Sequence, residues 1–267
     1  MKSVEFFGIS NSGKTFNKNK LKKRISLKKT YDYRSIILNF SNKKINLSLF
    51  DYVTLFYFKV IKSSFIKKLV LKNKKKKLKK TIKNFKIIKK NKNKEVNYFY
   101  ANYKNICQRL FIKLRNNNKK FHQFTFDLID NLKCGQEFKK LLKFWFVEEY
   151  CAHQIAKGCR NKIILDSEGF IQRLLVYIYF SPTKNHYKII NNYLNLCPLP
   201  SYLLITKFKK SKSIIKKVTL PETINIKKER KIFKKIKFII YKRIKIKKMN
   251  INVYEINDKT NYDRIKL

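Results

Sequence analysis

The sequence contains little glycine, proline and acid. Its 267 residues include only 5 glycines, 4 prolines and 16 aspartates and glutamates, which excludes collagen-like and proline- or glycine-rich repeat proteins. Apolar residues make up 44% of the chain, enough for a sizeable core, so a wholly disordered chain is excluded as well. No apolar run approaches the roughly 18 residues that a membrane-spanning helix needs, the longest being residues 174–180.

The sequence also lacks the features of an exported, disulfide-stabilised protein. Glu5 stands where a secretion signal would build its apolar region, so no such signal is visible. The five cysteines are an odd number without a CxxC pair, and neither they nor the three histidines have ligand spacing. We therefore expect reduced thiols in a cytoplasmic protein, without a metal site built from cysteine or histidine.

What the sequence has in excess is positive charge. Its 66 lysines and arginines give a formal net charge of +50, and 57 of the 66 are lysines. One explanation is A/T-rich coding, under which solvated positions drift to lysine and asparagine; the other is an electrostatic footprint for nucleic acid or anionic lipid. Charge spread along most of the chain favours drift. Either explanation predicts nonspecific binding of polyanions.

Apolar runs alternate with helical periodicities along the chain. We expect strands at residues 2–8, 162–166, 202–206 and 251–256, with a weak strand candidate at 35–40. We expect helices after residue 15, over a buried segment at 47–65, over 138–156 between Gly135 and Gly158, and over 170–180. This alternation is typical of an α/β domain with a central, mainly parallel sheet of about five strands and helices on both faces.

One motif carries specific chemistry. Residues 8–15, GISNSGKT, fit G-x-x-x-x-G-K-[ST], the phosphate-binding or Walker A pattern, and they follow an apolar strand as that pattern requires. Glycines let backbone N–H groups surround phosphate oxygens, and the next helix points its positive end at them. The alternative is a simple Gly/Ser turn after a strand. The residues expected to bind nucleotide are Gly8, Ser10, Asn11, Ser12, Gly13, Lys14 and Thr15, with Lys14 at the β- and γ-phosphates and the Thr15 hydroxyl on Mg²⁺.

A second motif lies at the end of the next expected strand. The apolar residues 163–165 lead into Asp166, the Walker B arrangement, in which an acid at the sheet edge holds Mg²⁺ directly or through water. Glu168 would orient or deprotonate the attacking group. The alternative is a strand end followed by a helix cap, because Asp and Ser are common cap residues. We expect the strand of Asp166 to lie beside the first strand.

With these two motifs the chain resembles the P-loop nucleoside and nucleotide kinases, the thymidylate-kinase-like group in particular. The resemblance rests on EFFGISNSGKTF at 5–16 and NKIILDSEGFIQR at 161–173, supported by the order of 200–208 and 250–258. It implies a single P-loop NTPase domain over 1–267, a three-layer sandwich that binds ATP or GTP with Mg²⁺ held by Thr15 and Asp166. Its substrate region would be a helical, lysine-rich insert at about 40–130, and its lid a basic segment at about 207–248.

The chain departs from that group at two places. Thymidylate kinases usually have arginine after the aspartate of the second motif, whereas Ser167 follows here. Their lid is rich in arginine, whereas this basic segment has only Arg230 and Arg243, and lysine lacks the bidentate fork of arginine. The resemblance therefore indicates nucleoside triphosphate binding more strongly than it indicates a phosphoryl acceptor.

Several functions are compatible with these motifs. The first is an ATP-dependent kinase of a nucleoside, nucleotide or other small molecule, in which Lys14, Asp166 and Glu168 act and Arg173 and Arg230 stabilise the transferring group, unless these arginines are ordinary surface charges. The second is a nucleic-acid-associated NTPase or polynucleotide kinase, because basic residues interleave with aromatics over 83–103. A membrane-surface protein that lies on anionic lipid through 230–249, and a sulfotransferase, are further alternatives. We expect the lysine-rich segment at 72–94 to be exposed and peripheral.

Overall fold

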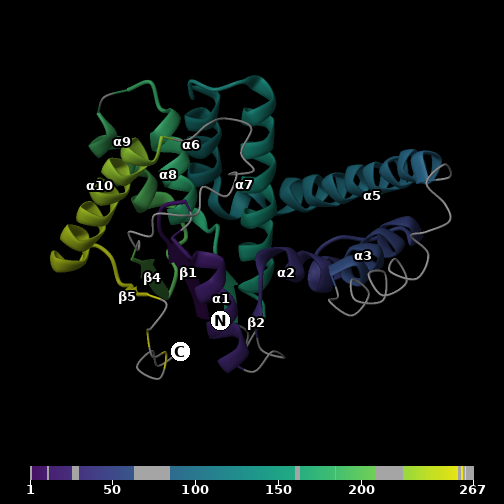
Figure 1. Cartoon of the computed structure of the whole chain (residues 1–267), viewed down its shortest axis with the longest axis horizontal. Helices are drawn as coiled ribbons and strands as arrows, with labels where there is room; N and C mark the ends of the chain where they lie inside the picture. The colour runs from purple at the N-terminus through teal and green to yellow at the C-terminus, as the bar shows by residue number, and fades with distance from the viewer. Residues whose placement is uncertain are drawn as a thin grey trace.

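The computed structural model shows an α/β protein built on one five-stranded sheet (Figure 1). It describes residues 2–10, 12–25, 30–62, 85–159, 163–183, 185–207, 225–257, 260 and 262. The strands are β1 (Lys2–Phe7), β2 (Thr30–Tyr31), β3 (Ile163–Asp166), β4 (Tyr202–Thr206) and β5 (Asn252–Ile256). All neighbours pair in parallel, in the order β2-β3-β1-β4-β5.

The four main strands confirm the sequence prediction. The strand of Asp166 also lies beside the first strand, with Asp166 in register with Glu5. The weak strand candidate at 35–40 is wrong, because these residues belong to helix α2 (Tyr33–Phe40). The buried run at 36–38 suits a strand and a helix equally, and Asp32 decides between them: its side chain accepts from the N–H of Ser35 and caps the helix. The fifth strand is the short β2 instead.

Helices account for most of the remaining described chain. They are α1 (Lys14–Arg24), α2, α3 (Leu49–Lys62), α5 (Phe85–Leu114), α6 (Lys119–Asp130), α7 (Gln136–Ala156), α8 (Phe170–Phe180), α9 (His186–Leu196) and α10 (Ile226–Lys245), with the 3₁₀ turns η2 (Ser41–Lys43) and η3 (Arg115–Asn118). The expected helices after residue 15, over 138–156 and over 170–180 are confirmed. The helix expected at 47–65 forms as α3, but it exposes Tyr52, Val53 and Phe56, so the expectation that it is wholly buried is wrong.

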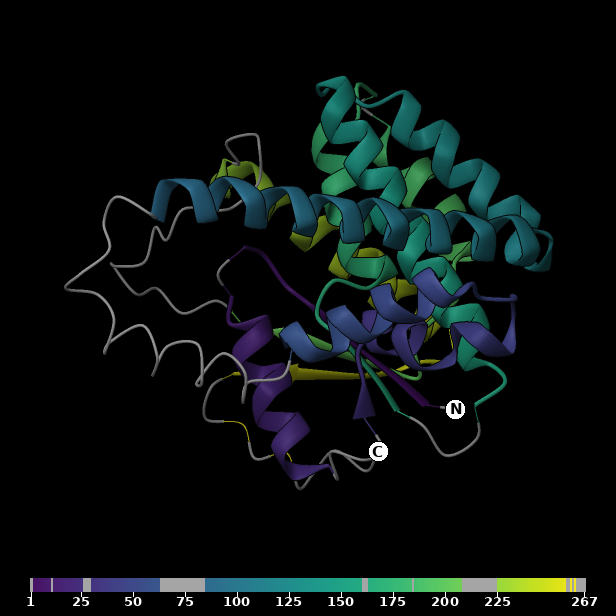
Figure 2. The same ribbon diagram turned by 90° about the vertical axis from the view of Figure 1, so that its right-hand side faces the viewer.

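Side chains of the sheet alternate between two cores, as the period of a strand requires. Val4 and Phe6 pack with Leu21 of α1 in a small core. Phe7 and Ile164 belong to a much larger core that includes residues of α7, α8 and α10. Helices thus cover both faces, as a parallel sheet demands, but the layer opposite α1 is far thicker (Figure 2).

Helices α3 and α5 extend side by side away from the sheet (Figure 1). The C-terminal part of α5 returns to the body of the protein, where Ile106 and Leu110 are buried in the large core. Most described residues of the segment at 40–130 are helical, apart from the connection at 44–48. The lysine run at 72–80 and residues 208–224 of the basic segment lie outside the described residues. Among the helices that are described, none combines the length and apolar character that crossing a membrane requires.

Candidate functional site

The loop at residues 8–13 follows the central strand of the sheet. β1 has β3 on one side and β4 on the other, so the chain changes its direction of winding at this strand. In open α/β sheets, ligands bind beyond the carboxyl ends of the strands at such a switch point. The sheet therefore carries the predicted phosphate-binding motif at the position where a ligand is expected.

Two glycines shape this loop for reasons that the structure makes explicit. Gly13 has φ = 84° and immediately precedes α1, a conformation that favours glycine. At Gly8 an added Cβ would lie 1.9 Å from Thr206 Oγ1 and 2.4 Å from Ser12 Oγ. These two hydroxyl oxygens are themselves hydrogen-bonded at 2.6 Å, so the loop is packed against the end of β4 and leaves no room for a side chain.

Lys14 folds back over the loop that precedes it. Its Nζ donates to the carbonyl oxygens of Gly8 and Ile9, at 2.9 and 3.1 Å. Burial lowers the pKa of this ammonium, while the carboxylates of Glu168 and Glu229 act in the opposite direction. The first turn of α1 contains no acid, and no described side chain caps it. Positive charge and unpaired N–H groups therefore converge at one point.

Glu229 approaches the same loop, which the sequence did not predict. It lies in the first turn of α10, is 4% exposed, and accepts from the N–H and hydroxyl of Ser10 at 2.8 and 2.9 Å. Its Oε2 has no hydrogen-bond partner in the part of the chain that is described. The sequence signal was an isolated acid in a strongly basic segment. Arg230, the predicted charge stabiliser, follows it and is half-buried; Asn11 lies outside the described residues.

Asp166 ends β3 and is only 3% exposed. Its Oδ1 accepts from the N–H of Glu168 at 2.9 Å, and its Oδ2 has no partner among the described residues. Burial raises its pKa to about 6. Glu168 is exposed, as is Thr15 on the first turn of α1. The negative charge of Glu168 acts on the pKa of Lys14, which relates Glu168 to the loop. Within the described chain, no hydrogen bond joins Thr15 to Asp166.

Arg173, expected to stabilise the transferring group, is a buried residue of α8. It is 5% exposed, and its Nε donates to Glu149 Oε2 at 2.5 Å. Its guanidinium carbon also lies 5.5 Å from the ring centroid of Trp145. This arginine therefore forms a buried ion pair with a carboxylate of α7.

Three further buried groups surround Asp166 and were missed by the sequence analysis. Glu5 lies beside it on β1, and its Oε1 accepts from the N–H of Gln172 at 2.6 Å. Burial and the nearby Asp166 raise the pKa of Glu5. Glu149 and His153 occupy successive turns of α7 and offer ligand atoms within 4.8 Å of those of Asp166. An acid inside an apolar strand, and Glu and His four residues apart in an apolar helix, were the signals available.

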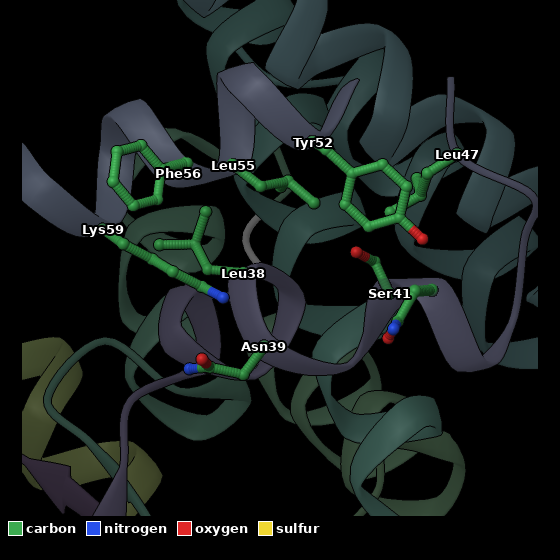
Figure 3. Close-up of a pocket in the computed structure, with 9 residues that line it drawn as sticks. Leu38, Asn39, Ser41, Leu47, Tyr52, Leu55, Phe56 and Lys59 are labelled. Atoms are coloured by element: carbon green, nitrogen blue, oxygen red, sulfur yellow. The ribbon is translucent and has the colours of Figure 1, made fainter. Parts of the chain in front are cut away.

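A separate pocket of about 260 Å³ lies between α2, η2 and α3 (Figure 3). Its wall is mainly apolar, and Lys59 and the amide of Asn39 provide polar groups at one side. Ser41 Oγ is buried in it without a partner in the described chain. The lining residues are Leu38, Asn39, Ser41, Asn42, Leu47, Tyr52, Leu55, Phe56 and Lys59.

Comparison with known proteins adds no identification. No protein-family model matches the chain, and no curated protein or solved structure shows significant similarity to it.

Proposed function

We propose that the chain binds a nucleoside triphosphate with Mg²⁺ at residues 8–15 and transfers the terminal phosphoryl group to a small molecule, as a kinase of the P-loop NTPase superfamily. One observation carries the proposal. The loop beyond the central strand places Gly13 in the left-handed region directly before the uncapped start of α1 and brings the ammonium of Lys14 over it. A polyphosphate is the ligand that this arrangement suits best.

The residues of the loop have the donor chemistry that a triphosphate needs. The first three N–H groups of α1 precede the first intrahelical bond, from Asn17 N–H to the Gly13 carbonyl oxygen, and so have no intrahelical acceptors. Lys14 would exchange two neutral carbonyl oxygens for anionic phosphate oxygens. Thr15 offers an exposed hydroxyl, and Asp166 a carboxylate oxygen without a partner in the described chain. These two residues would hold Mg²⁺, which neutralises charge on the β- and γ-phosphates when bound.

The remaining roles follow from charge and position. Lys14 stabilises the negative charge that develops on the transferring group. Glu168, exposed and electrostatically coupled to Lys14, accepts the proton of the acceptor hydroxyl as that oxygen bonds to the γ-phosphorus and the bond to the β-phosphate breaks. The nucleoside diphosphate leaves with the bond's electron pair. Nucleosides and nucleotides are the first acceptors to test.

A nucleic-acid-associated NTPase or polynucleotide kinase is a second candidate function. The observation that favours it is a group of exposed aromatic rings on the paired helices α3 and α5: Tyr52 is 50% exposed, Phe56 65% and Tyr98 64%. Exposed rings among lysines provide stacking for unpaired bases. Under this proposal the acceptor would be the end of a strand rather than a free nucleotide.

The experiment measures binding of ATP and GTP by calorimetry with and without Mg²⁺, at about 0.5 M KCl, where nonspecific attraction is screened over ~4 Å. Inorganic tripolyphosphate serves as the control for charge alone. Saturable binding that persists at high salt and needs Mg²⁺ supports the proposal. Equal affinity for nucleotide and tripolyphosphate, falling steeply with salt, would refute it.

Transfer of label from γ-labelled ATP then identifies the acceptor. A panel of nucleosides and nucleoside monophosphates is compared with a single-stranded oligonucleotide that has a free 5′ hydroxyl. Labelling of the small molecules supports the kinase proposal, and labelling of the oligonucleotide alone supports the second candidate. Release of inorganic phosphate with every acceptor, and label in none, indicates a hydrolase.

A further inference from the structure

Helix α7 and strand β3 bring three potential metal ligands together beneath the sheet edge. Glu149 and His153 lie four residues apart on α7, so they share one face of that helix, and Asp166 ends β3. Their ligand atoms all lie within 4.8 Å of one another, and all three side chains are buried. Two donors bound to one ion at about 2.1 Å are at most ~4.2 Å apart, so small side-chain rotations suffice.

In the carboxylates of Glu149 and Asp166, one oxygen accepts a hydrogen bond and the second has no partner among the described residues. Arg173 Nε binds Glu149 Oε2 at 2.5 Å, and the N–H of Glu168 binds Asp166 Oδ1 at 2.9 Å. Glu149 Oε1 and Asp166 Oδ2 are buried without a hydrogen-bond partner among the described residues. Leaving two buried anionic oxygens unsatisfied is costly, and outer groups that fix one carboxylate oxygen are typical of metal sites.

The local charge also calls for a cation. Glu5, Glu149 and Asp166 are each less than 5% exposed, and Arg173 forms an ion pair with Glu149. Three carboxylates and one guanidinium leave an excess of two negative charges when all are ionised. Burial raises the pKa of each of these carboxyl groups, so protons or a bound cation must balance this charge.

We propose that Glu149, His153 and Asp166 bind a divalent transition-metal ion of the Zn²⁺ or Mn²⁺ type. An imidazole with two carboxylates suits these ions, whereas Mg²⁺ prefers oxygen ligands and keeps several waters. The bound ion joins α7 to the carboxyl edge of the sheet. Glu149 and His153 have no part in the proposed nucleotide site, so variants of these two residues test this inference separately from it. Asp166 is common to both and is left unchanged in the test.

The test uses the full chain without a histidine tag, stripped with a chelator and titrated with Mn²⁺ and separately with Zn²⁺ by calorimetry, with metal content measured after dialysis. One ion per chain is expected. Electron spin-echo modulation of the Mn²⁺ complex should show an imidazole nitrogen. Absence of stoichiometric binding, or of the nitrogen signal, overturns the proposal without any variant being needed.

Two variants then assign the ligands. His153→Gln and Glu149→Gln remove a donor at nearly constant volume and are expected to weaken Mn²⁺ binding by about 100-fold. His186→Gln on α9 is the matched control and should bind like the wild type. Unchanged affinity in His153→Gln overturns the proposal, since an ion held elsewhere, for example by cysteines, would be unaffected. The same variants should still bind ATP. Loss of metal binding can therefore be distinguished from loss of nucleotide binding.

Discussion

The carboxylate of Glu229 accepts hydrogen bonds from the backbone N–H and the hydroxyl of Ser10, across 219 positions of the sequence. This contact attaches the first turn of α10 to the loop that follows β1. It also places a negative charge against a group of donors that the proposed function assigns to phosphate. Helix α10 is the described helix of the basic segment at 207–248, so the contact joins this helix to the loop.

Replacing this carboxylate tests whether it competes with phosphate. Glu229→Gln is expected to tighten ATP binding about three- to tenfold. The reason is that the substitution removes a repulsion of about 1 kcal/mol between the Glu229 carboxylate and the phosphates. The measurement is calorimetric titration at high salt, with Glu137→Gln on the exposed start of α7 as the control. Weaker binding in Glu229→Gln would show instead that this residue orders the loop for the nucleotide.

Lys14 provides the direct test of the loop. Lys14→Ala is expected to weaken ATP or GTP binding by about 100-fold, since charge-assisted hydrogen bonds contribute about 1.5–3 kcal/mol. Lys23→Ala, an exposed lysine in the last turn of the same helix, changes the net charge equally and should leave affinity at high salt unchanged. If the two variants lose affinity alike, the overall charge of the chain, and not the loop, attracts the nucleotide.

Asp166 separates nucleotide binding from the dependence on Mg²⁺. Asp166→Asn keeps the oxygen that accepts from Glu168 N–H but removes the charge that would hold the ion. Affinity for metal-free ATP should stay near the wild-type value, while the gain in affinity on adding Mg²⁺ should shrink about tenfold. The ratio of the two affinities is measured by fluorescence titration. An unchanged ratio contradicts the assignment of Asp166 to Mg²⁺.

Gly8 should tolerate a side chain poorly. A Cβ there would meet Thr206 Oγ1 at 1.9 Å, so Gly8→Ala is expected to lower the free energy of unfolding by about 2–3 kcal/mol through overpacking. At Gly158 the nearest atom would be the Ile155 carbonyl oxygen at 3.6 Å, an ordinary contact, which makes Gly158→Ala the control. Urea unfolding measures both. Equal stability would mean that the loop does not pack against β4 in solution.

Glu255 on β5 should make stability depend on acid pH. Ion pairs with Lys237 and Lys207 lower its pKa to about 2. A carboxyl group with a lowered pKa stabilises the folded state at pH values above its unfolded pKa, which is about 4.3 for Glu. This stabilisation is lost as the pH falls towards 2. Because the side chain is partly exposed, Glu255→Gln should cost only about 0.5–1 kcal/mol at pH 7, and the difference should vanish near pH 2.

Urea unfolding across this pH range is the measurement for Glu255. Repeating it in about 1 M NaCl should reduce the difference, because salt screens partly exposed pairs. A difference that stays constant from pH 7 to pH 2 would indicate lost packing rather than a lost ion pair.

Local patterns predicted the elements that local interactions form. The apolar run before Gly8 became β1, and α7 begins directly after Gly135. The pattern failed at 35–40, where the apolar run fits either structure and the Asp32 cap favours a helix. The two-residue strand β2 could not be foreseen, because it is too short to have a period of its own and forms by pairing with β3.

The sequence by itself determined a strand, a glycine-bounded loop with Lys14 and a following helix, since backbone conformation and hydrogen bonding there depend on neighbouring residues. Only the tertiary structure decided which charges meet. Arg173, expected at a transferring phosphoryl group, is paired with Glu149; Asp166 faces His153; and Glu229 reaches Ser10. These partners lie on different elements, and sheet order and helix packing bring them together. Burial then determines how strongly these groups interact, because a charge removed from water is destabilising unless the fold places an opposite charge or a hydrogen-bond partner beside it.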